Sequence, residues 1–192
     1  MISFVNLYKY NNMESYNLNQ TIEKLKGPTR EQLVCQNQWA AVALDRFHTN
    51  SNAEIEFLID GVVKTANLNW DSNFSKAAMK EMTEAANQGG VAMAMFVMSI
   101  LEDFKYVEQS EIGEGVDYRF MKNEPKDDDL NFLENPHYVE VSGILEESNS
   151  NTLNGRIKIK HNQIKRGARR DEESSVIVTL FRQPKTVKEV HP

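Results

Sequence analysis

The sequence has little cysteine and no long hydrophobic run. Its single cysteine, Cys35, excludes an internal disulfide framework and a zinc module built on several thiolates, and indicates a reducing compartment. The longest apolar run, Val91 to Leu101, is about half as long as a membrane-spanning helix. Residues 1–8 lack the charged start and unbroken apolar stretch of a signal peptide. We therefore expect a cytoplasmic protein without a membrane partner.

Glycine and proline are also scarce, with 9 and 5 residues in a chain of 192. These numbers exclude a collagen-like or low-complexity chain. With 40% hydrophobic and 26% charged residues, the composition is that of a folded protein. The length suits one domain of ordinary size with a small elaboration.

Positive charge is in deficit overall, and the formal net charge is −6. A polyanion is held mainly by neutralisation of its phosphates, so this balance argues against indiscriminate binding to nucleic acid. The segment 156–170 is an exception, because it holds seven basic residues and no acid. The rest of the chain has 15 basic and 28 acidic residues, a net charge of −13. Such polarity favours a docking face, although a solvated helix flank is the alternative.

The N-terminal part, residues 1–70, is predicted to be an elaboration with one helix and a β-hairpin. Thr29 and Gln32 have the spacing of a capping box at the start of the helix. The dipeptide Asp60-Gly61 lies between β-rich runs and favours a type I′ turn. Residues 2–8 are expected to form a short strand, and residues 11–20 a loop.

Residues 71–192 are predicted to form the core, with the order helix, three strands, helix, strand. The first helix is expected from Phe74 through Ala85, because apolar residues recur there at helical spacing. Gly89-Gly90 either ends this helix or marks close packing inside a longer one. Val91 to Leu101 is correspondingly a buried helix or a core strand. The remaining elements are strands over 104–109, 116–122 and 137–145, a helix from Leu153, and a strand over 175–181 that ends before Pro184.

Two carboxylates interrupt predicted strands at positions that look buried. Asp117 lies in the second strand of the core and Glu140 in the third. An unpaired buried carboxylate is costly, so such residues point to a function. The alternative is that each side chain faces solvent on a half-exposed strand.

Lys160 is predicted to lie on the buried side of the next helix. Leu153, Ile157 and Ile164 form one stripe at the helical period, and Lys160 falls within it. A strand with alternating Ile157 to Lys160 is a rival interpretation. Together with Asp117 and Glu140, the lysine would form a metal and general-base cluster. The alternative is a structural ion pair between Lys160 and Glu140.

The predicted elements that carry Asp117, Glu140 and Lys160 resemble, in their order and sequence motifs, the PD-(D/E)XK nuclease-like superfamily. They also resemble an uncharacterised bacterial family with the same order of motifs. The matching residues are Gly115, Asp117 and Tyr118; Glu140 to Ile144; Arg156, Lys160 and Gln163; and Val176 to Pro184. The resemblance implies an α/β fold, a mixed central sheet flanked by helices with a restriction-endonuclease-like αβββαβ core. It departs at Ser142, where nuclease members usually place a lysine.

The resemblance implies a divalent-metal-dependent nuclease that hydrolyses DNA or RNA, in a setting such as bacterial defence. Asp117 and Glu140 would hold Mg²⁺ or Mn²⁺, and Lys160 would take the role of the missing lysine. The substrate-binding residues would be Arg156, Gln163, Lys165, Arg166, Arg169 and Arg170. The alternative is an inactive subunit of the same fold that binds a protein partner, a larger complex or nucleic acid through residues 156–170. A protein-interaction module unrelated to nucleases would be favoured if Asp117 and Glu140 lay far apart.

Overall fold

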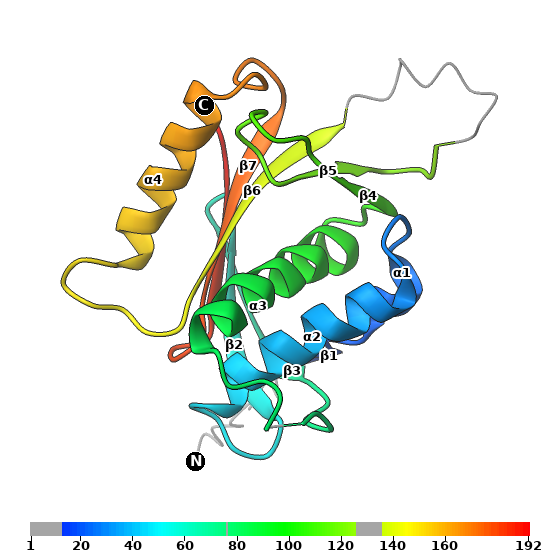
Figure 1. Cartoon of the computed structure of the whole chain (residues 1–192), viewed down its shortest axis with the longest axis vertical. Coiled ribbons are helices and arrows are strands. Elements are labelled where there is room, and N and C mark those ends of the chain that lie inside the picture. Colours follow the sequence, from blue (N-terminus) through cyan, green and yellow to red (C-terminus); the bar gives the residue numbers. More distant parts are fainter. Residues whose placement is uncertain (1–12, 76, 126–135) are drawn as a thin grey trace, which may run out of the picture.

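An eight-stranded mixed sheet forms the centre of the computed structural model, which describes residues 13–75, 77–125 and 136–192 (Figure 1). The strands lie in the order β1-β3-β2-β8-β7-β6-β5-β4. Their bounds are β1 Glu14–Asn17, β2 Asn52–Ile59, β3 Val62–Asn69, β4 Tyr106–Gln109, β5 Tyr118–Met121, β6 His137–Ile144, β7 Ser174–Leu180 and β8 Lys185–Val190. β6 runs parallel to β7 and antiparallel to β5. The predicted mixed central sheet flanked by helices is confirmed.

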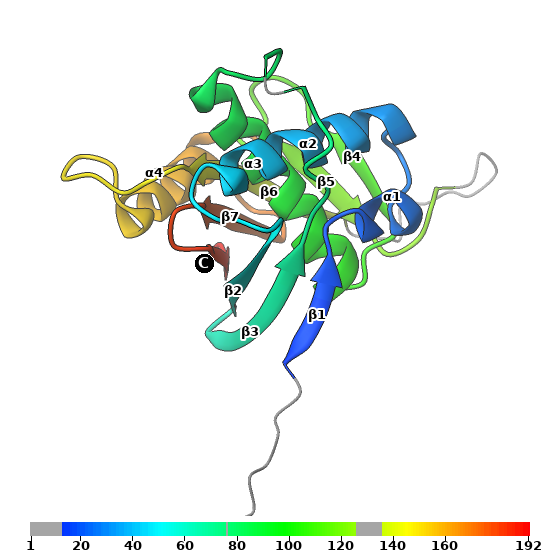
Figure 2. The same cartoon turned by 90° about the horizontal axis from the view of Figure 1, so that it is seen from below.

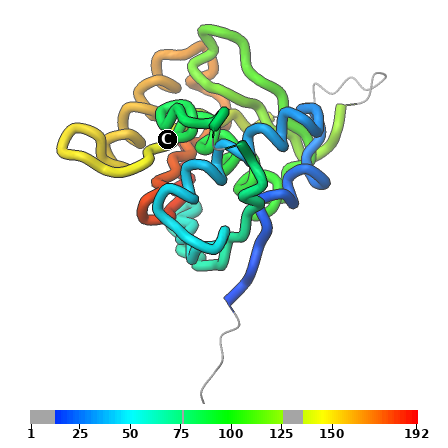
Figure 3. The backbone as a smooth tube through the Cα atoms, turned by 60° about the horizontal axis from the view of Figure 1, so that its bottom comes forward, coloured from blue at the N-terminus to red at the C-terminus, as the bar shows by residue number. Residues whose placement is uncertain are grey.

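Helices cover both faces of this sheet. On one side are α1 (Gln20–Lys24), α2 (Arg30–Asp45) and α3 (Met82–Phe96), which continues into η1 (Val97–Leu101). On the other side α4 (Leu153–Arg166) lies against β6 and β7 (Figure 1). The connection from β6 to α4, residues 145–152, projects from the body of the molecule (Figure 3).

Two separate apolar clusters follow from this arrangement, one on each face. Val139 and Val141 of β6 belong to the cluster under α2 and α3, whereas Tyr138 and Ile144 belong to the cluster under α4. Side chains alternate along a strand, so Glu140 shares the α4 side with Tyr138 and Ile144. The covering helix α4 is thereby the element that can supply its partner.

The predicted helix and hairpin of the N-terminal part are confirmed. At the start of α2 the Thr29 hydroxyl accepts from the Gln32 backbone N–H, and the Gln32 side chain accepts from that of Thr29. β2 and β3 pair around Asp60 and Gly61, both with positive φ, as a type I′ turn requires. β1, β3 and β2 lie side by side at one edge of the sheet (Figure 2).

Two expectations need correction, and one choice between alternatives is decided. Residues 14–17 pair in parallel with β3 and residues 20–24 form α1, so the stretch from 11 to 20 is not simply a loop. The core helix begins at Met82 and not at Phe74, because Glu81 caps it by accepting from the Thr83 backbone N–H. It then continues through the glycine pair, so the stretch from Val91 is helical. The predicted strand over 2–8 lies outside the described residues.

Besides β1, the strand β8 was not predicted. β8 follows β7 after a short turn that contains Pro184, pairs antiparallel with β7, and then pairs in parallel with β2. It thus joins the hairpin of residues 52–69 to the C-terminal strands in one sheet. The division at residue 70 stays a prediction, and the hydrogen-bonded sheet runs across it.

Among the described residues, no helix has the length and apolar character needed to cross a membrane.

Candidate functional site

Asp117 lies directly before β5 and is fastened to β6. Its backbone N–H donates to the Val139 carbonyl at 2.9 Å, and its carboxylate Oδ2 accepts from the Val141 backbone N–H at 2.7 Å. These two bonds flank Glu140 on the same strand. The β5–β6 ladder ends at Tyr118 and Val139. Beyond it, the Asp117 carboxylate accepts the backbone hydrogen bond of β6 that a neighbouring strand would otherwise accept.

Glu140 is a buried carboxylate, with 3% of the residue exposed. Its Oε1 accepts from the Lys160 ammonium at 2.6 Å. Burial raises the pKa of Glu140 to about 7, and the neighbouring charge of Asp117 contributes to this rise against the opposing effect of Lys160. Asp117 and Glu140 are thus close enough to repel, and the protein-interaction module that required them to lie far apart loses its support.

Lys160 reaches Glu140 because of how α4 is built. The Thr152 hydroxyl caps the helix by accepting from the Gly155 backbone N–H at 3.1 Å. Leu153, Ile157 and Ile164 are buried, whereas 54% of Ile159 is exposed. The helical stripe is therefore confirmed, and the rival strand interpretation is wrong. The ion pair between Lys160 and Glu140, which was the alternative to a metal and general-base cluster, is also present.

A cavity of about 280 Å³ opens beside this cluster. We call it the carboxylate cleft. It is lined by Asn87, Gln88, Val91, Gln109, Asp117, Tyr118, Val141, Ser142, Arg156 and Lys160. The lining residues come from α3, β4, β6, α4 and the start of β5, so the cleft lies where the two helical layers meet beyond the end of the β5–β6 ladder. Polar and charged groups predominate, as expected for a polar substrate.

A second cavity, of about 260 Å³, lies on the loop side of the carboxylates. We call it the loop cavity. Asp117 lines it as well, and so do Glu140, Gln109 and Gln163. Asp117 therefore lines both cavities, whereas Glu140 lines the loop cavity and not the carboxylate cleft.

The structure divides the predicted substrate-binding residues into two groups. Arg156 lines the carboxylate cleft, where its guanidinium donates to Asn151 Oδ1 at 2.7 Å, and Gln163 lines the loop cavity. Arg169 is engaged elsewhere, since it pairs with Glu114 and lies over the Tyr138 ring. The remaining members of the set are exposed and line neither cavity: Lys165, Arg166 and Arg170.

Ser142 occupies the position at which the resemblance expects a lysine. It is buried, two residues after Glu140 on the same face of β6, and lines the carboxylate cleft. Lys160 lines the same cleft from α4. The structure therefore brings a lysine to this cavity from the helix instead of the strand.

Sequence reasoning missed the amide side chains of the site, Asn87, Gln88 and Gln109. The glycine pair after Gln88 was the available signal. A Cβ at Gly90 would lie 2.7 Å from the Gly143 backbone nitrogen, and a Cβ at Gly143 would lie 1.8 Å from the Ala86 carbonyl oxygen. These glycines let the backbone of α3 contact that of β6. Close approach places the preceding amides, Asn87 and Gln88, at the carboxylate cleft.

The donor set fits a hard divalent cation better than zinc. Within the described parts of the chain, no group of three or more His, Cys, Asp or Glu side chains converges as a metal cage. Mg²⁺ is commonly held by one or two carboxylates together with water and substrate phosphate. Asp117 and Glu140 supply such a pair, and their mutual repulsion is what a cation would relieve.

Comparisons of the chain with protein-family models, with curated proteins and with solved structures find no match. The case for a function therefore rests on the geometry of the carboxylate cleft.

Proposed function

We propose that the protein is a divalent-metal-dependent nuclease that hydrolyses phosphodiester bonds in DNA or RNA, with a restriction-endonuclease-like core of the PD-(D/E)XK type. The observation that carries this proposal is the linked cluster of Asp117, Glu140 and Lys160, in which Lys160 pairs with Glu140 and Asp117 lines both the carboxylate cleft and the loop cavity. The order α3-β4-β5-β6-α4-β7 supports it, because the αβββαβ core has that order. A setting in bacterial defence remains an inference by analogy.

In this proposal Asp117 and Glu140 hold Mg²⁺ or Mn²⁺, which when bound polarises the phosphate and lowers the pKa of a water. The backbone N–H of Val141 keeps the Asp117 carboxylate oriented. Lys160 balances the buried charge of Glu140 and offsets the charge that develops on the phosphate. Arg156, at the same cleft, contacts the phosphate backbone.

The test is cleavage of single- and double-stranded DNA and RNA with Mg²⁺ or Mn²⁺. Asp117→Asn, Glu140→Gln and Lys160→Met are each expected to reduce the rate at least about 100-fold, because electrostatic stabilisation of a transition state has that size. Lys158→Met is the matched control, since Lys158 is exposed on the same helix. Equal cleavage by the wild type and the three variants would contradict the proposal.

A second candidate is an inactive subunit of the same fold that binds nucleic acid or a protein partner. Ser142 in place of the strand lysine favours it, as do the exposed basic side chains of Lys165, Arg166 and Arg170. The same experiment separates the two candidates. Binding without cleavage under every metal condition would favour the inactive subunit.

A further inference from the structure

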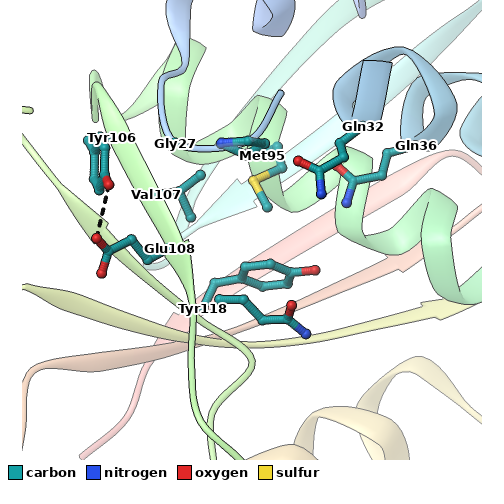
Figure 4. Close-up of a pocket in the computed structure, with 10 residues that line it drawn as sticks. Gly27, Gln32, Gln36, Met95, Tyr106, Val107, Glu108 and Tyr118 are labelled. Carbon is teal, nitrogen blue, oxygen red and sulfur yellow. Dashed lines mark hydrogen bonds between the residues drawn. The ribbon is translucent and has the colours of Figure 1, made fainter. Parts of the chain in front are cut away.

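A third cavity, of about 290 Å³, adjoins the carboxylate cleft on the side of α2. We call it the amide pocket (Figure 4). Tyr118 and Gln109 line both the amide pocket and the carboxylate cleft, and Gln109 also lines the loop cavity. The three cavities therefore follow one another around Gln109. Asp117 and Tyr118 are consecutive residues, so the carboxylate site and the amide pocket meet at the start of β5.

The amide pocket combines an apolar floor with hydrogen-bonding groups. Met95 and Val107 are buried and line it. Figure 4 shows the Tyr118 ring and the amide ends of Gln32 and Gln36 turned toward the same space. A flat ring that stacks on Tyr118 would have its edge beside the two amides.

Two of these polar groups have hydrogen-bonding capacity to spare. Gln36 Oε1 is buried without a partner, which is costly unless a ligand supplies one. The Gln32 Oε1 already accepts from the Thr29 backbone N–H at 2.8 Å, so its NH₂ group remains as a donor. The Tyr118 hydroxyl is a further group that can both donate and accept. The pocket thus offers both donors and acceptors.

The charge of the amide pocket excludes a phosphate as its main occupant. No lysine or arginine is among the described residues that line it, and its one acid, Glu108, is paired with Arg119 and accepts from the Tyr106 hydroxyl. The cationic groups, Lys160 and Arg156, lie at the neighbouring cleft. A neutral heteroaromatic ring fits the amide pocket, and an anion fits the cleft.

We propose that the amide pocket binds one unpaired nucleobase of the nucleic acid whose phosphate lies at the carboxylate cleft. This inference rests on the proposed function and adds to it a preference for substrates in which a base is unpaired. The base stacks on Tyr118, and its edge exchanges hydrogen bonds with Gln36 and Gln32.

The test compares a single-stranded DNA 10-mer with an abasic 10-mer of the same backbone, by fluorescence anisotropy in EDTA so that no cleavage occurs. Base-aromatic stacking is worth about 5- to 150-fold in affinity for each base. We expect the abasic strand to bind the wild type at least about 5-fold more weakly. In Tyr118→Leu and Gln36→Leu that difference should shrink at least about 3-fold, whereas Tyr118→Phe should keep it.

Gln38→Leu is the matched control, because Gln38 lies on the same helix but lines a different cavity. Circular dichroism of each variant checks that it is folded. Equal binding of the two strands by the wild type, or an unchanged ratio in folded Tyr118→Leu and Gln36→Leu, would overturn the nucleobase proposal even if cleavage persists. A base-dependent ratio without cleavage would uphold the pocket and count against the nuclease. Binding of neither strand would overturn the nucleobase proposal, and the separate cleavage assay with Mg²⁺ or Mn²⁺ would still decide on the nuclease.

Discussion

The substitution Glu140→Gln is expected to make the protein more stable at pH 8, although it removes one partner of an ion pair. Glu140 is 3% exposed, and its pKa is raised to about 7 by burial and by Asp117. In the unfolded state the carboxyl has its ordinary pKa of 4.5. Between pH 4.5 and about 7, the folded state therefore keeps a proton on Glu140 that the unfolded state releases. The stability that this proton provides is complete below pH 4.5 and is lost as the pH rises to about 7.

The size of the effect follows from the difference between the two pKa values. At about 1.4 kcal/mol for each pH unit, the shift from 4.5 to about 7 amounts to about 3 kcal/mol. Glutamine resembles the neutral carboxylic acid in shape and stays uncharged. The Gln variant should thus have a free energy of unfolding about 3 kcal/mol above that of the wild type at pH 8, and close to it near pH 4.5.

The assay is urea denaturation of the metal-free protein, followed by circular dichroism between pH 4.5 and 8. Glu54→Gln is the control, because it makes the same change at an exposed position on β2 and should leave the profile unchanged. A Glu140→Gln protein that is less stable than the wild type at pH 8 would refute the reasoning. So would a difference between the two proteins that does not vary with pH.

Three further predictions concern the lysine, the glycine contact and the buried histidine. Lys160→Ala should lower the cleavage rate about 100-fold, and adding Ser142→Lys, which restores an ammonium to the same cleft, should recover at least about tenfold; no recovery in a folded double variant would contradict a shared role. Gly90→Ala should lower the free energy of unfolding in urea by about 1–3 kcal/mol through overpacking against β6. The exposed Thr83→Ala control on α3 should change it by less than about 0.5 kcal/mol, and equal effects would contradict the contact. Burial lowers the pKa of His137, so the wild type should lose stability as the pH falls below about 6.5, the ordinary histidine value. This opposes the trend from Glu140, and His137→Gln should remove the loss in thermal melts at pH 5 and 7; an unchanged slope would contradict the assignment.

The elements with strong local signals were predictable from the sequence. The capping box of Thr29 and Gln32 and the turn at Asp60-Gly61 depend on backbone requirements that only a few residue types meet. The stripe of α4 depends on helical period, which is set by residues a few positions apart. Each of these features is local.

The elements that were not predicted from the sequence depend on contacts between residues that lie far apart in the chain. β8 carries three charged residues, Lys185, Lys188 and Glu189, and looks like a polar tail. It is a strand because β7 and β2 pair with it on both sides and because Lys188 is neutralised by Asp60 and Glu102. β1 is likewise short, and it exists through its parallel pairing with β3. Short single-sequence patterns do not contain such partners.

The candidate site was predictable in its charged members and in Gln163, but not in its other amides. Asp117, Glu140 and Lys160 were conspicuous because a charge in an apolar pattern is costly. Gln36 and Gln109 are ordinary residues for a helix and a strand end, and only the cavities they line distinguish them. Their neighbours across the pocket come from other elements, so no spacing along the chain indicates them.

The position of α4 divides the basic side chains of segment 156–170 into two groups. Lys160 and Arg156 turn inward to a cleft that holds Asp117, whereas Lys165, Arg166 and Arg170 stay exposed near the end of the helix. Lys160 pairs with the buried Glu140, Arg156 donates to Asn151, and the outward group adds exposed positive charge close by. A nucleic acid guided to the end of α4 would therefore reach the carboxylates along the same helix. Under the proposed nuclease function, a chain with a net charge of −6 would then present one localised basic face to a polyanion while its remaining surface repels it.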